Sequence, residues 1–140
     1  GAELLALDGV ATHEGPALRG AAVAPCLARD GGWQPAEDWG CWSRGDTSRL
    51  RFRLFLEHIM PNHHALDLFL CGRYADGKGR TGVTVNGRSL GEFSLGHGEP
   101  GIRVPLALLG QYERLEITLN HRGGDYGIES IGYDLVSHEI

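Results

Sequence analysis

Cysteine, lysine and long apolar runs are scarce in this 140-residue chain, and each shortage excludes a class of protein. The three cysteines cannot all pair, and none lies in a C-x-x-C motif, so neither a zinc ribbon nor a dithiol redox motif is available. We expect Cys26, Cys41 and Cys71 to be reduced and partly buried. No apolar stretch approaches the roughly 20 residues of a transmembrane helix, so we expect no membrane insertion.

A basic surface is also lacking. The formal net charge is -5 at pH 7, which argues against a nucleic-acid partner, because such a partner requires cations that neutralise phosphates. The 13 basic residues comprise Lys78 and twelve arginines. This bias fits the codon usage of a GC-rich genome, or a need for forked guanidinium groups that bind carboxylates, phosphates or sugar hydroxyls.

Catalytic motifs are missing as well. The chain has no G-x-S-x-G elbow, no H-E-x-x-H and no P-loop. Glu37 and Asp38 lie beside tryptophans, and two carboxylates can hydrolyse a glycosidic bond. Adjacent residues rarely place their carboxyls on opposite sides of one bond, so a second acid would have to come from elsewhere in the chain, for example Asp125 or Glu129. We therefore expect a protein that is not an enzyme, with no catalytic residues and no cofactor.

Metal-ligating residues do not form a recognisable set. His63 and His64 are adjacent to one another, and neighbours on a strand point to opposite faces. Asp76 and Asp125 lie in glycine-rich stretches, but a D-x-D-x-D run of the kind that binds calcium is absent. We expect no metal site.

What the chain does contain is an alternation of apolar and polar residues, with 22 glycines and 6 prolines between the alternating runs. Period two is typical of strands that bury one face, and so much glycine argues against a helical bundle. The pair Asn86-Gly87 predicts a hairpin with a type I′ turn. The sequence therefore predicts an all-β, antiparallel jelly-roll sandwich of about eight strands, with the even positions of 50–56 and 66–70 in the core.

The organisation along the chain is that of a single domain over residues 1–140. Residues 1–30 are less regular, with candidate strands at 4–7 and 21–27, the latter at an edge because it contains Pro25. Residues 31–140 carry the motifs, and 105–110 have room for one helical turn at most. The chain opens on Gly-Ala, which we interpret as an excision from a larger protein.

The most informative segment holds all three tryptophans within ten positions, from Trp33 to Trp42. Indole rings stack on the apolar faces of sugars, while Glu37 and Arg44 are suited to hydrogen-bonding sugar hydroxyls. The alternative is that the rings plug one end of the sandwich, since tryptophan is highly buried on average. A mixture of buried and exposed rings fits the pattern best.

The same segment, G-W-x-x-x-E-x-W-G-x-W-S-x-G over residues 32–45, is followed by an alternating strand and by Met60-Pro61-Asn62. This pattern resembles an accessory β-domain of bacterial surface-polysaccharide glycosyltransferases and phosphoglycerol-type transferases. The run 124–129 resembles the closing segment of that family, and the 83–91 hairpin is similar to galactose-binding-like jelly rolls. The resemblance implies a non-catalytic module attached to a glycosyltransferase-type parent enzyme, in the bacterial cytoplasm or at the inner face of the membrane through that parent.

Two hypotheses of different class follow. The first is a carbohydrate-binding or substrate-presenting module for polysaccharide biosynthesis; the second is a structural docking or oligomerisation module without a sugar ligand. A small glycan-cleaving enzyme is a weaker alternative. Exposed tryptophan rings favour the first and buried rings the second. If glycan binds, the expected ligand-binding residues are Trp33, Glu37, Trp39, Trp42, Arg44, Asp125 and Tyr126.

One further feature is the row Arg49, Arg51 and Arg53, which shares one face of a predicted strand. It is read either as a solvated outer face or as a concave surface for an anionic glycan.

Overall fold

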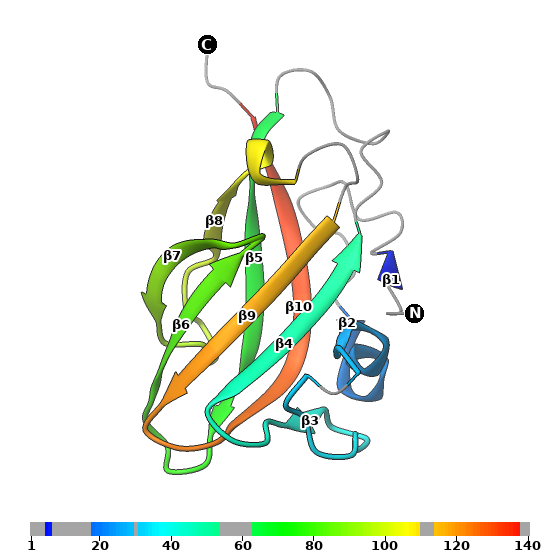
Figure 1. The fold of residues 1–140 in the computed structure, drawn as a ribbon, viewed down its shortest axis with the longest axis vertical. Helices are drawn as coiled ribbons and strands as arrows, with labels where there is room; N and C mark the ends of the chain where they lie inside the picture. The colour runs from blue at the N-terminus through cyan, green and yellow to red at the C-terminus, as the bar shows by residue number, and fades with distance from the viewer. Residues whose placement is uncertain (1–4, 7–17, 30, 54–62, 110–113, 138–140) are drawn as a thin grey trace.

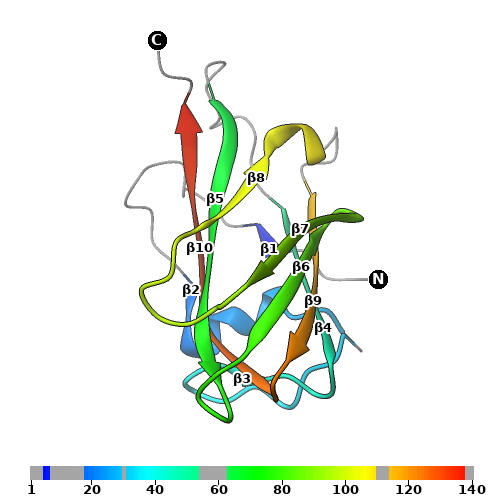
Figure 2. The ribbon, with the colours of Figure 1, turned by 90° about the vertical axis from the view of Figure 1, so that its left-hand side faces the viewer.

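The computed structural model describes residues 5–6, 18–29, 31–53, 63–109 and 114–137, and within them two β-sheets pack face to face (Figures 1 and 2). In the first sheet the strand order is β1-β4-β9-β6-β7, and in the second it is β2-β10-β5-β8, with β3 paired to β10. The strands are β1 (Leu5–Ala6), β2 (Leu18–Arg19), β3 (Cys41–Trp42), β4 (Thr47–Arg53), β5 (His63–Tyr74), β6 (Arg80–Val85), β7 (Arg88–Phe93), β8 (Ile102–Pro105), β9 (Arg114–Arg122) and β10 (Tyr126–Ser137).

The strand order is that of a jelly roll, as the sequence predicts. From β4 onward the chain crosses between the two sheets at every connection except the β6–β7 hairpin. Two four-stranded sheets, β4-β9-β6-β7 and β2-β10-β5-β8, thus make up the eight-stranded sandwich. Strand β1 extends the first sheet as a short parallel neighbour of β4.

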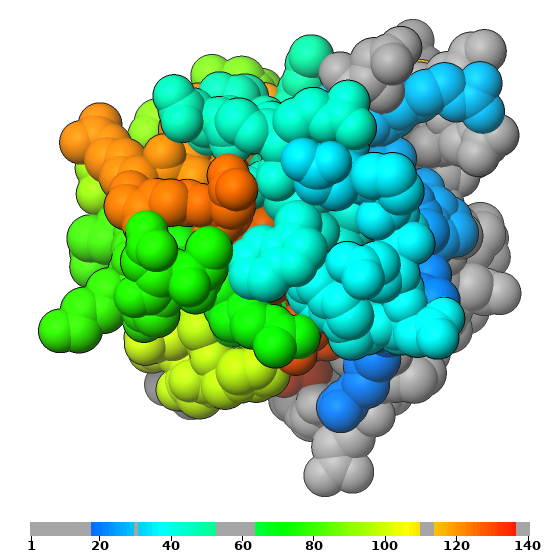
Figure 3. All heavy atoms as spheres, turned by 90° about the horizontal axis from the view of Figure 1, so that it is seen from below, coloured from blue at the N-terminus to red at the C-terminus, as the bar shows by residue number. Residues whose placement is uncertain are grey.

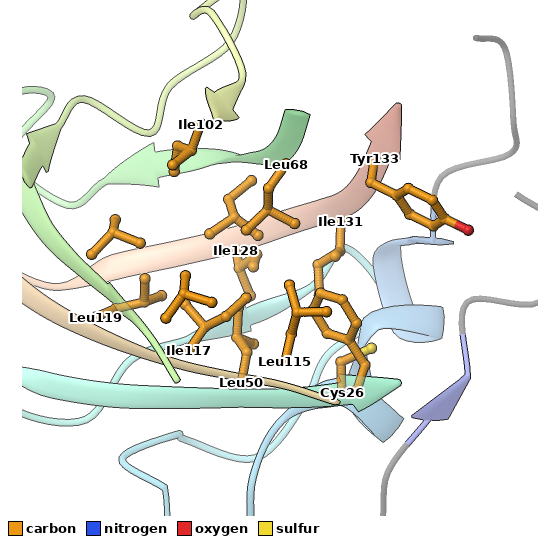
Figure 4. Packing of buried hydrophobic residues seen from close by; sticks show 14 of the residues in the cluster. Cys26, Leu50, Leu68, Ile102, Leu115, Ile117, Leu119, Ile128, Ile131 and Tyr133 are labelled. Carbon is orange, nitrogen blue, oxygen red and sulfur yellow. The ribbon is translucent and has the colours of Figure 1, made fainter. Parts of the chain in front are cut away.

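Alternation along the strands builds the core, because every second side chain points between the sheets. In β9, Leu115, Ile117 and Leu119 are almost completely buried, whereas the residues between them face outward. Figure 4 shows these side chains meeting Ile128 and Ile131 from the opposite sheet. The predicted core positions within the described residues, Leu50, Phe52, Leu66, Leu68 and Leu70, are all buried.

The predicted hairpin is present. Val85 pairs with Arg88 across a two-residue turn in which Asn86 and Gly87 both have positive φ, 49° and 85°. These values fit a type I′ turn, whose twist matches that of the flanking strands. The Asn86 side chain fixes the turn further, because its amide nitrogen donates to the carbonyls of Leu108 and Arg114.

The first part of the chain departs from expectation. The candidate strand at 21–27 is instead the 3₁₀-helix η1 (Gly20–Cys26), with Pro25 inside it. Val23 and Cys26 are the buried pair, and their spacing of three residues is the period of a 3₁₀-helix rather than that of a strand. The helical turn predicted within 105–110 is found as η3 (Leu106–Leu108).

Some predicted positions lie outside the described residues. These are core positions 54 and 56 and the two end residues, 4 and 7, of the candidate strand at 4–7. Among the residues that the structure does describe, no helix has the length and apolar character to cross a bilayer.

Candidate binding surface

The tryptophan segment lies at the end of the sandwich where β5 turns into β6 and β9 turns into β10. Figure 3 views this end, with the segment in cyan beside the β5–β6 turn in green and the β9–β10 turn in orange. Backbone hydrogen bonds order the segment: Gln34 N–H donates to the Trp42 carbonyl and Glu37 N–H donates to the Gly40 carbonyl. A further bond from Ser43 N–H to the Tyr126 carbonyl ties the segment to β10.

Trp33 is the ring that plugs the fold. Its indole N–H donates to the Arg49 carbonyl at 2.7 Å, and its side chain is half-buried against the hydrophobic core. An indole that packs against the core and has its N–H satisfied by a backbone carbonyl is a structural element of the domain. Trp33 therefore contributes to stability, although all three tryptophans are partly exposed, so the predicted mixture of buried and exposed rings is not found.

Trp39 and Trp42 form a separate pair on the outer face of the second sheet. Their ring centroids are 5.3 Å apart in an edge-to-face arrangement with an interplanar angle of 68°, and both residues are partly exposed. The rings lie against Gly127 of β10: a Cβ at this position would come within 2.7 Å of Cη2 of Trp39 and 3.0 Å of Cε3 of Trp42. Glycine thus leaves the strand surface flat enough for two indoles to cover it.

A guanidinium completes the pair. The Cζ of Arg73, on β5, lies 4.5 Å from the ring centroid of Trp39 and 5.9 Å from that of Trp42, a cation–π arrangement. Arg73 also pairs loosely with Glu129, at 3.8 Å, and Glu129 in turn is hydrogen-bonded to His97 Nε2 at 2.8 Å. We call Trp39, Trp42, Arg73 and Glu129 the aromatic platform.

Three other predicted site residues, Asp125, Arg44 and Glu37, lie in three different places. Asp125 is exposed and, with Gln34, Trp42 and Ala75, lines a shallow pocket of about 330 Å³ beside the platform. Arg44 is exposed but lines a different hollow, next to Trp33. Glu37 is exposed in the turn that precedes β3.

The position of Tyr126 contradicts the prediction that its side chain binds a ligand. It is 0% exposed, and its hydroxyl donates to the Leu95 carbonyl at 2.8 Å. The alternation along β10 explains this placement, because Tyr126 and Ile128 point into the core while Gly127 between them faces the platform. Tyr126 supports the surface from below and does not reach it.

Sequence reasoning gave no site role to Arg73, Gly127 or His97, and the one site role that it considered for Glu129 was that of a second catalytic acid. Arg73 pairs in register with Gly127, from a strand more than fifty residues earlier. The alternation of β5 does predict that Arg73 faces outward, since its neighbours Gly72 and Tyr74 are buried. What no local pattern shows is that this strand lies beside β10 and beneath the tryptophans.

The buried side chain of His121 is held between two hydroxyl groups in the core. Ser48 Oγ lies 2.7 Å from Nε2 of His121, and Thr81 Oγ1 lies 3.0 Å from its Nδ1, with all three residues buried. Burial lowers the pKa of His121 to about 4. Ser48 is 0% exposed, so this Ser–His pair has no access to a substrate in the structure.

No group of three or more potential metal ligands comes together within the described ranges. His58 lies outside the described residues, as does the side chain of His63.

The arginine row is on the outer face of the first sheet: Arg49 is exposed, and Arg51 pairs with Glu116 at 3.5 Å. The side chain of Arg53, the third member of the row, lies outside the described part of the structure.

Comparison with known proteins adds little to this geometry. No family model and no curated protein matches the chain. Two solved structures of latent aurone synthase, a polyphenol oxidase, are similar at a TM-score of 0.47 each: the recombinant protein is 21% identical over 68% of this chain, and the natural one is 17% identical over 94%. The chain spans 25% and 28% of their lengths. Similarity at this level carries no functional argument, and membership of the polysaccharide-associated family stays a prediction.

Proposed function

We propose that this domain is a non-catalytic glycan-binding module whose ligand stacks on the aromatic platform. The observation that carries the proposal is the Trp39–Trp42 pair, which is partly exposed beside a guanidinium on an otherwise flat strand surface. Indole faces bind the apolar faces of sugar rings, and flanking charged groups hydrogen-bond the hydroxyls. Trp42 is the principal stacking ring in this proposal, because Arg73 lies closer to Trp39 and covers it.

The surroundings supply the polar groups that orientation of a sugar requires. Asp125 and the Gln34 side of the segment border the shallow pocket next to Trp42, so a sugar stacked on this ring has hydrogen-bonding partners at its edge. Arg73, whose Cζ lies 5.9 Å from the centroid of the same ring, and its partner Glu129 offer a further donor and acceptor. Trp33 and Tyr126 are left out of the ligand contacts and act as supports.

The biological setting is proposed from the resemblance alone. The module would serve a bacterial glycosyltransferase-type enzyme of polysaccharide biosynthesis, holding or presenting its glycan in the cytoplasm or at the inner face of the membrane. The competing proposal is docking on a parent protein without sugar. It is favoured by the partial burial of both rings and by the Arg73 cover on Trp39, since half-buried aromatics beside arginine are also typical of protein interfaces.

The two proposals are separated by measuring sugar affinity and melting temperature on the same variants of the 140-residue chain. Binding is first sought on an array of bacterial-type oligosaccharides. In Trp42→Ala we expect the loss of one stacking ring to cost about 1–3 kcal/mol of binding, roughly a five- to hundredfold weaker affinity. Phe93→Ala, a partly buried aromatic packed on the core from β7, is the matched control and should lose stability without losing affinity.

The outcomes differ clearly. Loss of affinity in Trp42→Ala with retention in Phe93→Ala supports the glycan site. Absence of any glycan binding by the unaltered chain, together with a lower melting temperature of Trp42→Ala, contradicts it and favours docking.

A further inference from the structure

A second hollow near the platform is lined by Arg73. It has a volume of about 440 Å³ and is bordered by the β5–β6 turn and by residues 94–99. Three cations line it, Arg73, Lys78 and Arg80, against one carboxylate, that of Glu99. Glycines occupy much of the remaining wall, so the backbone there is open to a ligand.

The three cations differ in how far they are already neutralised. Arg80 is engaged by Glu92, through its carboxylate at 3.5 Å and its carbonyl at 3.1 Å. By contrast, no acidic side chain within the described part of the chain pairs with Lys78, which is exposed in the turn between two glycines. Lys78 is thus an exposed cation in the lining of the hollow.

Arg73 is the cation that joins the hollow to the platform. Its guanidinium lies over the Trp39 ring, while the residue also lines the hollow. The distance from Nη2 of Arg73 to Oε1 of Glu129 is 3.8 Å, which is long for an ion pair, and the Arg73 side chain is 52% exposed. Glu129 keeps a shorter hydrogen bond to His97, so Arg73 can turn to another anion without leaving that carboxylate unpartnered. A planar guanidinium binds carboxylate or sulfate groups through two parallel hydrogen bonds.

We propose that the glycan of this module carries an acidic sugar residue, whose anionic group enters the hollow and is bound by Arg73 and Lys78 while a ring stacks on Trp42. The inference rests on the proposed function and adds the class of ligand to it. Arg73 lies 5.9 Å from the Trp42 centroid, so one stacked sugar and its substituents, or the next sugar along, reach the guanidinium. Glu99, which also lines the hollow, can accept hydrogen bonds from the hydroxyls of the bound sugar.

The experiment uses pairs of oligosaccharides that differ in charge alone. Galacturonate, glucuronate and mannuronate oligomers are each presented to the 140-residue chain beside their carboxyl-reduced counterparts, with sulfated oligosaccharides as a separate arm. We expect at least one acidic member to bind on the order of tenfold more tightly than its reduced counterpart, the scale of one charge-assisted hydrogen bond. Arg73→Gln and Lys78→Gln should each remove most of this preference, and added salt should weaken it.

Arg88→Gln is the matched control, because Arg88 is an exposed arginine at the opposite end of the β6–β7 hairpin from Arg80. It should leave the preference intact, and melting temperatures of all variants show whether the fold is retained.

Each remaining result decides the question. Equal binding of acidic and reduced oligosaccharides overturns the acidic-sugar inference and leaves the glycan-binding proposal standing. No binding by either member of any pair overturns both. Competition by inorganic sulfate as strong as that by the oligosaccharide shows a simple anion site and overturns the inference as well. Tight binding in the sulfated arm alone supports an anionic sugar and identifies sulfate as its group.

Discussion

Lowering the pH from 7 to 5 should destabilise this domain through one buried side chain, His121. Its ring lies on the inner side of β9 between the hydroxyls of Ser48 and Thr81, and it stacks on Tyr126 with ring centroids 5.3 Å apart. Both hydroxyls can accept a hydrogen bond, so a doubly protonated ring would still find partners. The cost of protonation is therefore the removal of a charge from water, and burial lowers the pKa of His121 to about 4.

The sign of the effect follows from which state binds the proton first. In the unfolded chain the ring has the ordinary pKa of about 6.5. Above pH 7 both states are neutral and the group has no effect on stability. As the pH falls below 6.5 the unfolded state takes up the proton while the folded state does not. The free energy of unfolding then decreases by about 1.4 kcal/mol per pH unit until folded His121 is itself protonated near pH 4, for a total of about 3 kcal/mol.

The assay is urea unfolding at pH 7 and pH 5, where carboxylates change little. We expect the unaltered chain to lose about 2 kcal/mol more between these two values than His121→Gln, in which the other histidines still titrate. If His121→Gln does not fold, the ring resonances of His121 in the unaltered chain report its pKa directly. A resonance that titrates near pH 6.5, or equal pH dependence in the two chains, would refute the reasoning.

Two glycine substitutions test the local geometry. Gly127→Ala should destabilise the chain by about 1–3 kcal/mol and change the near-ultraviolet circular dichroism of the indoles, because its Cβ would come within 2.7 Å of Trp39. Gly82→Ala in β6, whose nearest atom would be 3.8 Å away, is the matched control and should change neither, and an equal effect in both would contradict the account. Gly87→Ala should cost about 1–2 kcal/mol of unfolding free energy in urea, because its φ is 85°. Gly96→Ala, in open space with no positive φ, should be close to neutral, and a neutral Gly87→Ala would argue against the type I′ turn.

Much of the fold could be predicted because the signals that specify it are local. Alternation along β9 and along the described part of β4 places the right residues between the sheets, and Asn86-Gly87 specifies its turn without reference to the rest of the molecule. Residues 21–27 were harder, because a short apolar run with one proline fits an edge strand as well as a helix. The helical conformation of this run is supported by a partner outside it, because the N–H of Ala21, at the start of η1, donates to the carbonyl of Asp38.

One half of the binding surface, the two tryptophans, could be predicted from the sequence. The other half could not, because its residues come from distant strands. Trp39 and Trp42 stand three residues apart in one segment, so their proximity is local information. The flat surface beneath them belongs to Gly127 and the guanidinium above them to Arg73, which meet through the pairing of β10 with β5. That pairing joins residues more than fifty positions apart, and no spacing within the tryptophan segment encodes it.

The same reasoning separates the three tryptophans, which look equivalent in the sequence. Trp33 has its N–H satisfied by the Arg49 carbonyl of β4 and packs against the core, whereas the other two rings lie outside the second sheet. A pattern that counts tryptophans would assign all three to a ligand. A pattern for this surface must instead join Trp39 and Trp42 to an outward-facing arginine on β5 and a glycine on β10, because the cation–π contact and the flat strand surface together form the platform.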